Sequence, residues 1–177
     1  MEEFTFFWNG PLSQWEHSIF TVDGVEYNCA EQYMMAEKAR MFGDEEKLEE
    51  ILEAEHPKTQ KALGRSVYPF DNDVWQEDSD NGRARCWNIV WSGNMAKFSQ
   101  NPFLLERLVA TKGTTIVEAS PYDRIWGVGM READRRITNR ENWQGRNWLG
   151  EVLTNVREFL MVDARVYNAK SDERWPG

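Results

Sequence analysis

The chain has 177 residues, 41% of them hydrophobic and 29% charged, with a formal net charge of −9. This length suits one domain with a real core, and the ordinary hydrophobic fraction argues against disorder for most of the chain. The negative charge argues against a protein that coats nucleic acid through bulk electrostatics. No apolar run is long enough to span a membrane and the acidic start lacks a signal-peptide pattern, so we expect a cytoplasmic protein without membrane contact.

Cysteine and histidine are scarce. Cys29 and Cys86 lack the spacing of metal ligands, so we expect reduced core residues and a cytosolic setting. His17 and His56 have no cysteine or acidic cluster spaced to complete a metal site with them. A zinc or iron enzyme is therefore disfavoured, and we expect no cofactor.

The first half is predicted to contain a strand, a hairpin and several helices. The Asp23-Gly24 pair between β-formers is typical of a type I′ turn, which requires positive φ at both central residues. Pro57 suits the first turn of a helix, and Gly43 and Gly64 suit helix ends. The expected elements are a strand at 4–8, a hairpin at 19–27, and helices at about 29–42, from 44, at 57–64 and over 72–98.

The second half is predicted to be helix, strand, long loop and helix. Asn101-Pro102 is typical of a cap and a first-turn proline, opening a helix to about Thr111. The β-branched run 114–119 predicts a buried strand, and 131–146 has few apolar residues and predicts a functional loop. A last amphipathic helix is expected over 147–162, followed by a polar tail at 163–177. The fold class is therefore α+β, predominantly helical: one domain over 4–162 with a small N-terminal sheet.

The helix at 29–42 carries two charges where apolar residues are expected. Glu31, Met34, Met35, Lys38 and Phe42 form the stripe that normally faces a core. Glu31 and Lys38 are almost two turns apart, about 10 Å along the axis of one helix face. A buried charge needs a partner, an exit to water or a chemical role. An acid and an amine on one wall of a groove predict a site that binds a ligand between them.

A simpler interpretation exists for each of the two charges. Asn28 and Glu31 have the spacing of a capping box, with Asn28 as the N-cap and Glu31 as its third-position partner. Lys38 could lay its stem on Met34 and Met35 and keep its amine in water. The pair is more suggestive than either residue alone.

The segment 124–146 combines arginines with tryptophans. The segment contains six arginines and three acidic residues, and the planar guanidinium group suits the binding of phosphate. This pattern favours a pocket for a small phosphorylated group, although a salt-bridged surface loop remains an alternative. An aromatic side chain beside arginines is a natural stacking platform for a nucleobase. The aromatic residues concerned are Trp126 and Trp143.

Several segments together resemble the NADAR family, which includes the YbiA-like N-glycosidases. Their order and spacing, over about Phe6 to Leu160, make the resemblance specific. They are Ser13-Gln14-Trp15, the helix Ala30-Glu31-Gln32-Tyr33-Met34-Met35-Ala36-Glu37-Lys38-Ala39, Ala62-Leu63-Gly64-Arg65, Lys97-Phe98-Ser99-Gln100-Asn101-Pro102, the run from Val117 to Gly129, and Trp143 to Gly150.

The resemblance implies hydrolysis of an N-glycosidic bond at the anomeric carbon of a ribose. Members of the family remove ADP-ribose from modified guanine, and the YbiA-like branch acts on phosphorylated riboflavin-pathway intermediates. Some YbiA-like members have an acid where this chain has Val128, which favours the ADP-ribose branch. The implied partners are ADP-ribose, or ADP-ribosylated guanine in a nucleotide or DNA, with an ADP-ribosyltransferase toxin as functional counterpart. A binding module without catalysis is a further alternative.

The resemblance also implies site residues. Glu31 and Lys38 are the expected catalytic pair: Lys38 would capture the opened ribose as a Schiff base, and Glu31 would shuttle protons. Trp126 would stack on a base, and Arg124, Arg131 and Arg146 are candidates for the pyrophosphate. The expected substrate-binding residues are Ser13, Trp15, Asp123, Arg124, Trp126, Gly127, Gly129, Arg131, Arg146 and Asn147.

Overall fold

The computed structural model describes residues 2–172, and the side chains of 2–162. Within these residues the chain forms seven α-helices, two pairs of strands and two short 3-10 turns. In chain order the elements are β1 (Phe4–Phe7), β2 (Phe20–Val22), β3 (Val25–Tyr27), α1 (Ala30–Phe42), α2 (Glu45–Glu53), α3 (Pro57–Arg65), α4 (Asn72–Trp75), α5 (Arg85–Gln100), α6 (Pro102–Val109), β4 (Thr115–Glu118), η1 (Arg135–Thr138), η2 (Arg140–Asn142) and α7 (Trp148–Asp172).

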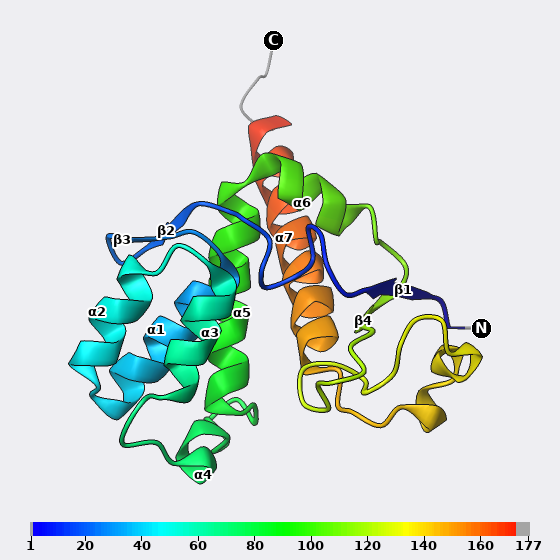
Figure 1. Ribbon diagram of the computed structural model, residues 1–177. Helices are drawn as coiled ribbons and strands as arrows, with labels where there is room; N and C mark the ends of the chain where they lie inside the picture. Colours follow the sequence, from blue (N-terminus) through cyan, green and yellow to red (C-terminus); the bar gives the residue numbers. More distant parts are fainter. Residues whose placement is uncertain (1, 173–177) are drawn as a thin grey trace.

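Helices α5 and α7 pack together at the centre of the fold (Figure 1). Helix α1 packs against α5 and is flanked by α2 and α3, whereas β1 and β4 lie beside α7. Strands β1 and β4 pair in parallel, from Phe4 opposite Thr115 to Phe7 opposite Glu118. The predicted predominantly helical α+β class is confirmed.

The hairpin and the end of α1 follow the predicted turn chemistry. Asp23 and Gly24 have φ angles of 50° and 79°, so both central residues of the β2–β3 turn have the positive φ that a type I′ turn requires. Gly43 closes α1 with a φ of 71°, and its N–H donates to the carbonyls of Ala39 and Arg40. Glycine adopts this left-handed conformation without steric cost.

The start of α1 contradicts the capping-box interpretation. Cys29 occupies the N-cap position without a side-chain capping bond. The backbone N–H of Asn28 donates to Oε1 of Gln32 at 2.8 Å, and the N–H of Glu31 donates to the carbonyl of Gln14 at 3.0 Å. The Glu31 carboxyl is therefore free of a capping role, because glutamine takes the reach-back contact one position later.

The helix expected over 72–98 is two helices, α4 and α5, separated by a turn. Asp71 caps α4, and its carboxylate accepts the N–H groups of Asp73 and Val74. Gly82 has a φ of 70°, which lets the chain turn back so that the N–H of Ser79 donates to the carbonyl of Arg83 at 2.8 Å. Residues 76–83 contain no apolar side chain and include the turn pair Asn81-Gly82, so the sequence itself carries a signal for the break between the two helices.

The two later helices also differ from expectation at their ends. Helix α6 ends at Val109 rather than near Thr111, and α7 continues to Asp172 rather than ending near 162. Residues 163–172 are polar but contain neither glycine nor proline, so nothing in their sequence ends the helix. Residues 173–177 of the expected tail lie outside the described residues. The long loop at 131–146 is present, interrupted only by η1 and η2.

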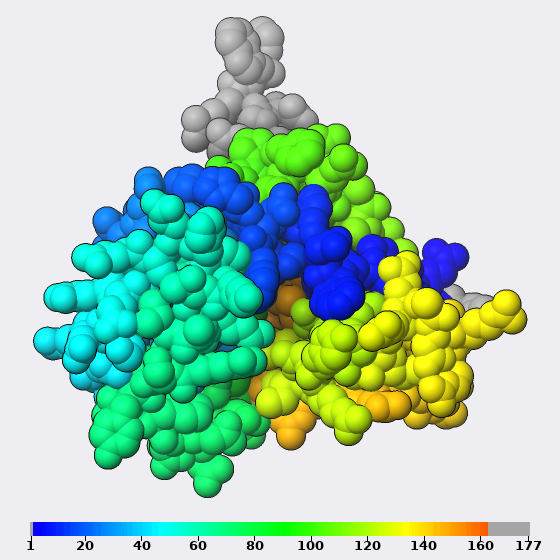
Figure 2. Space-filling view, in the orientation of Figure 1, coloured from blue at the N-terminus to red at the C-terminus, as the bar shows by residue number. Residues whose placement is uncertain are grey.

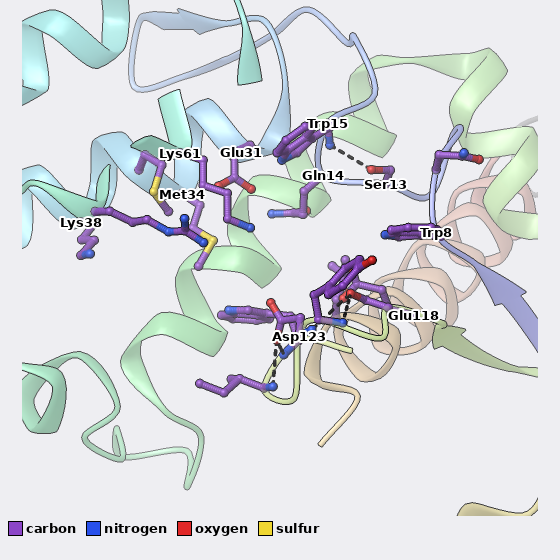
Figure 3. A pocket seen from close by; sticks show the side chains of 18 of the residues that line it. Trp8, Ser13, Gln14, Trp15, Glu31, Met34, Lys38, Lys61, Glu118 and Asp123 are labelled. Atoms are coloured by element: carbon purple, nitrogen blue, oxygen red, sulfur yellow. Dashed lines mark hydrogen bonds between the residues drawn. The ribbon is translucent and has the colours of Figure 1, made fainter. Parts of the chain in front are cut away.

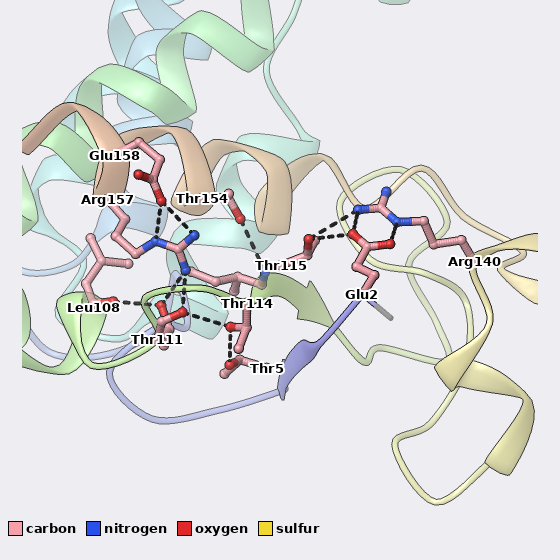
Figure 4. Close-up of polar contacts among 11 residues, drawn as sticks. Glu2, Thr5, Leu108, Thr111, Thr114, Thr115, Arg140, Thr154, Arg157 and Glu158 are labelled. Atoms are coloured by element: carbon pink, nitrogen blue, oxygen red, sulfur yellow. Dashed lines mark hydrogen bonds and ion pairs between the residues drawn. The ribbon is translucent and has the colours of Figure 1, made fainter. Parts of the chain in front are cut away.

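A polar cluster fastens β4 to α7 (Figure 4). The Arg157 side chain is 3% exposed and donates from Nη1 to the carbonyl and Oγ1 of Thr111, at 2.6 and 2.9 Å. Oγ1 of Thr154 accepts the N–H of Ile116 at 3.2 Å, and Arg140 pairs with Glu2 beside the other strand. These contacts satisfy buried polar groups and hold β4 in place, and with it Glu118, the last residue of the strand.

Candidate active site

A pocket of about 790 Å³ lies between the two halves of the fold. Helices α1 and α3 form one wall, the segment 8–15 closes the top, and the loop after β4 forms the opposite wall. Figure 2 shows the hollow where the N-terminal segment, α3 and the yellow-green loop after β4 meet. Leu149 of α7 and Trp75 of α4 also line it. This volume suits a ligand of nucleotide size.

The charged stripe of α1 lies on the wall of this pocket. Glu31, Met34, Met35 and Lys38 all line it (Figure 3), so the helix face that resembled a core face borders the pocket. Tyr33, on another face of α1, packs closely against Gly93 of α5. Between Glu31 and Lys38 this face is apolar, because Met34 and Met35 form part of the pocket wall.

Glu31 is held almost out of solvent, at 5% exposure. Burial raises the pKa of its carboxyl, while the charge of Lys61 and the side chain of Trp15 oppose that rise. A carboxyl with a raised pKa keeps its proton to a higher pH than an ordinary glutamate does, which suits proton transfer to a bound ligand.

Lys38 is half-buried at the other end of the stripe. Its Nζ donates to the carbonyl of Gly64 at 2.7 Å and lies 3.9 Å from the centroid of the Phe70 ring. Burial, followed by the nearby charge of Arg65, lowers the pKa of Lys38. A lysine with a lowered pKa has a larger fraction of the neutral amine, which is the nucleophilic form.

The opposite wall carries acids and an aromatic ring. Oδ1 of Asp123 accepts the backbone N–H groups of Ile125 and Trp126 at 2.8 and 2.7 Å, which holds the loop in a tight turn. Trp126 lines the pocket and packs edge-on against Trp148, with 5.7 Å between ring centroids. Glu118, the last residue of β4, also lines this wall (Figure 3) and was not among the predicted site residues.

Besides Lys38, the basic side chains that line the pocket come from α3 rather than from the arginine-rich loop. Lys61 and Arg65 are one turn apart, line the pocket and form no ion pair within the described part of the chain. The three predicted arginines are outside the pocket lining, because each is engaged elsewhere. Arg124 donates to Gln144, Arg131 to the Tyr122 hydroxyl, and Arg146 lies over the Trp148 ring and donates to Gln76.

Three other predicted binding residues support the pocket wall from behind. Asn147 is buried with a φ of 57°; its Oδ1 accepts the N–H of Glu118 and its Nδ2 donates to the carbonyl of Ile116, both at 3.0 Å. A Cβ on Gly127 would lie 3.1 Å from the carbonyl oxygens of Glu118 and Asp123, and Gly129 has a φ of 68°. These residues shape the loop without lining the pocket.

Aromatic residues surround the mouth of the pocket. Trp8, Trp15 and Tyr122 line it and are 53%, 44% and 76% exposed. The rings of Trp8 and Tyr122 lie 6.1 Å apart. Trp143, expected as a stacking platform, instead packs against Phe4 and donates its indole N–H to the carbonyl of Ile137 at 2.7 Å.

A buried lysine positions the segment that closes the top of the pocket. Lys97 is 0% exposed, and its Nζ donates to the carbonyl of Ser13 at 2.8 Å. Asn94, one turn earlier on α5, donates to Oε1 of Gln14 at 2.8 Å. Burial lowers the pKa of Lys97 to about 7. Ser13 and Trp15, both predicted binding residues, line the pocket because α5 anchors this segment.

Comparisons with known proteins agree with this geometry. The model of the NADAR domain matches residues 6–161. The chain belongs to the NADAR family. The family's N-glycosidases are hydrolases. No helix within residues 2–172 is long and apolar enough to cross a membrane.

Among curated NADAR-related proteins, N-glycosidase R617 of Acanthamoeba polyphaga mimivirus is 46% identical over 135 residues, covering 76% of this chain and 75% of that protein. Protein irg-1 of Caenorhabditis elegans is 40% identical over 138 residues, covering 77% of this chain and 62% of that protein. The chloroplastic riboflavin biosynthesis protein PYRR of Arabidopsis thaliana is 29% identical over 124 residues, which are 18% of its length.

Among solved structures, the NMR structure of the Escherichia coli protein YbiA resembles this fold with a TM-score of 0.72. The two chains are 26% identical, and the match covers 93% of this chain and 89% of YbiA.

Proposed function

We propose that the chain is an N-glycosidase that removes ADP-ribose from ADP-ribosylated guanine in nucleic acid. The observation that carries this proposal is the pairing of Glu31 and Lys38 on one wall of a nucleotide-sized pocket. Burial shifts the pKa of each toward the neutral form, upward for Glu31 and downward for Lys38. A protein that only binds its ligand would not need a lysine whose pKa is lowered toward the neutral amine.

The proposed chemistry is covalent catalysis at the anomeric carbon. Opening of the ribose ring exposes that carbon at the aldehyde level of oxidation, and the neutral amine of Lys38 adds to it. Loss of the base then leaves a Schiff base on Lys38, and water releases ADP-ribose. Glu31 moves the protons of the ring oxygen and binds ribose hydroxyls from the same helix face.

The remaining lining residues suit the other parts of this substrate. Lys61 and Arg65 would bind the pyrophosphate in place of the arginines of the loop, because among the described residues they are, besides Lys38, the basic side chains that line the pocket without an ion pair. Trp126 would stack on the base beside the reacting bond. Trp8, Trp15 and Tyr122 at the mouth offer further stacking surfaces for bases of a single strand.

A second candidate is hydrolysis of a phosphorylated riboflavin-pathway intermediate. It is favoured by the two riboflavin biosynthesis proteins that are 29% identical over parts of this chain. Val128 argues against it: this residue is 0% exposed and packs with Val117, Ala119, Met130 and Ile137, so the acid of some YbiA-like members has no counterpart here.

The test is incubation of the protein with a DNA oligonucleotide that carries ADP-ribosylated guanine. Mass spectrometry would follow released ADP-ribose, beside Lys38→Ala and the surface control Lys112→Ala. We expect release by the wild type and by Lys112→Ala, and a loss of roughly 10³-fold or more for Lys38→Ala.

Release by Lys38→Ala at the wild-type rate would contradict the covalent mechanism. Absence of release by the wild type, with turnover of a phosphoribosylamine from the riboflavin pathway, would replace the proposal with the second candidate. Tight binding of ADP-ribose without turnover of either substrate would make the chain a binding module.

A further inference from the structure

Glu118 is fixed in the pocket by its backbone rather than by its side chain. Its N–H is held by Oδ1 of Asn147, and its carbonyl accepts the N–H of Val128 at 3.0 Å. It also ends the parallel pairing of β4 with β1, opposite Phe7. Both backbone groups are therefore satisfied, and the side chain is left to extend from the strand end into the pocket (Figure 3).

The carboxyl of Glu118 has no structural partner that explains it. Its Oε2 is shielded from water and makes no hydrogen bond to any described residue. A buried oxygen without a partner costs free energy, and a catalytic or ligand-binding role is one reason for which a structure keeps such a group. No ion pair within residues 2–162 involves Glu118, although Lys61 lines the same pocket.

The surroundings of Glu118 favour the protonated form of its carboxyl. Burial, and then the charge of Asp123, raise the pKa of Glu118 to about 7; Glu31 across the pocket adds to the rise and Lys61 of α3 opposes it. At neutral pH the carboxyl is therefore protonated in a large fraction of molecules. A group poised in this way can both give and take a proton.

We infer that Glu118 is a second catalytic carboxyl, which protonates the departing base from the wall opposite Glu31. This inference rests on the proposed N-glycosidase function. Glu31 shares a helix face with Lys38, so it lies on the side where the ribose is captured. Glu118 shares its wall with Asp123 and Trp126, where the base would stack, so the leaving nitrogen faces Glu118.

The proton transfers balance over one turnover. As the bond between the anomeric carbon and the base nitrogen breaks, its electron pair goes to the nitrogen, which takes the proton of Glu118. The Glu118 carboxylate then takes a proton from the water whose oxygen adds to the anomeric carbon. The net change is the addition of one water, with hydroxyl to carbon and hydrogen to nitrogen. Two carboxyls with divided roles are common in glycoside hydrolysis.

The decisive comparison is Glu118→Gln against the wild type on two substrates, with Glu106→Gln on the surface of α6 as the matched control. The first substrate is the ADP-ribosylated guanine oligonucleotide. The second is p-nitrophenyl ADP-riboside, whose phenolate departs without a proton. We expect Glu118→Gln to lose about 10²–10⁴-fold in kcat on the first and less than tenfold on the second. Glu106→Gln should match the wild type on both.

A second measurement determines the protonation of the Glu118 carboxyl in the absence of substrate. Carbon-13 labelling of glutamate side-chain carboxyls, with the Glu118→Gln spectrum used for assignment, follows the titration of Glu118 by NMR. We expect a midpoint close to neutral pH, and a midpoint near the ordinary value of 4.5 would overturn the inference.

The kinetic outcomes separate this inference from the proposed function. Release of ADP-ribose by the wild type and Glu118→Gln at equal rates would overturn the inference and leave the proposed function standing. Equal losses on both substrates would also overturn it, since they would indicate a positioning role. No release by the wild type would overturn the proposed function, and the catalytic role of Glu118 with it.

Discussion

At the scale of single residues, Glu31 is a buried acid whose replacement should lower the catalytic rate without lowering stability. Glu31→Gln keeps the size of the side chain and removes its proton chemistry, so we expect kcat to fall about 10²–10⁴-fold. The free energy of unfolding at pH 8 should be unchanged or higher, because a buried carboxylate is no longer present. Single-turnover kinetics and urea denaturation measure the two effects.

Glu37→Gln is the control on the same helix, because Glu37 pairs with Arg40 outside the pocket. It should keep the wild-type rate. A normal rate for Glu31→Gln together with a loss of stability would show that Glu31 is a structural residue.

Residue patterns predicted the α1 wall of the pocket and, on the opposite wall, Trp126 but not Glu118. Spacing of 3.6 residues per turn places Glu31 and Lys38 on one helix face from the sequence alone. Glu118 could not be found this way, because the end of a buried strand looks the same whether it borders a core or a cavity. Lys61 and Arg65 resemble the solvated face of a short helix. The arginines predicted for the pyrophosphate instead donate to Gln144, Tyr122 and Gln76.

At the scale of elements, the position of α1 depends on a close approach to α5. A Cβ on Gly93 would lie 2.5 Å from Cδ1 of Tyr33, a rigid ring, so Gly93→Ala must displace one helix from the other. We expect a loss of about 1–3 kcal/mol in the free energy of unfolding. Because α1 carries Glu31 and Lys38, kcat should fall as well. Thermal unfolding and the release assay measure these effects.

Ser99→Ala is the matched control, because Ser99 is exposed on the same helix and alanine is the better helix former. It should leave both stability and kcat close to the wild type. If Gly93→Ala were as stable as this control, the helix contact would not limit the position of α1.

Elements with distinct local chemistry were predicted closely, and those without it were not. The Asp23-Gly24 turn and the Gly43 end of α1 appear as expected because few residues adopt positive φ. The single helix expected over 72–98 was wrong, because the polar segment 76–83 and its Asn81-Gly82 pair are typical of a turn and not of a helix interior. The end of α7 was placed too early because polar composition was read as a helix end.

At the scale of the whole molecule, the raised pKa values of the pocket acids should appear in the pH dependence of stability. Glu118 has a pKa of 4.5 in the unfolded chain and about 7 in the folded one, and that of Glu31 is also raised. The folded state therefore binds these protons more tightly, and the stability they contribute is complete below pH 4.5 and lost as pH rises through about 7. Removal of Glu118 should flatten this fall.

Urea denaturation of the wild type and Glu118→Gln between roughly pH 5 and 8 measures this difference. The stability of the variant relative to the wild type should increase across this range by about 1–3 kcal/mol. A constant difference between the two proteins would mean that the Glu118 carboxyl is ionised throughout, as an ordinary glutamate is.

In the proposed mechanism, Lys38 forms a covalent bond to the anomeric carbon of ribose. The most direct measurement is brief reduction with cyanoborohydride during turnover of ADP-ribosylated guanosine, followed by intact-protein and peptide mass spectrometry. We expect one ADP-ribosyl adduct, on Lys38, in the wild type and in the Lys112→Ala control, and none in Lys38→Met. Turnover without an adduct, or an adduct on Lys61 in place of Lys38, would contradict it.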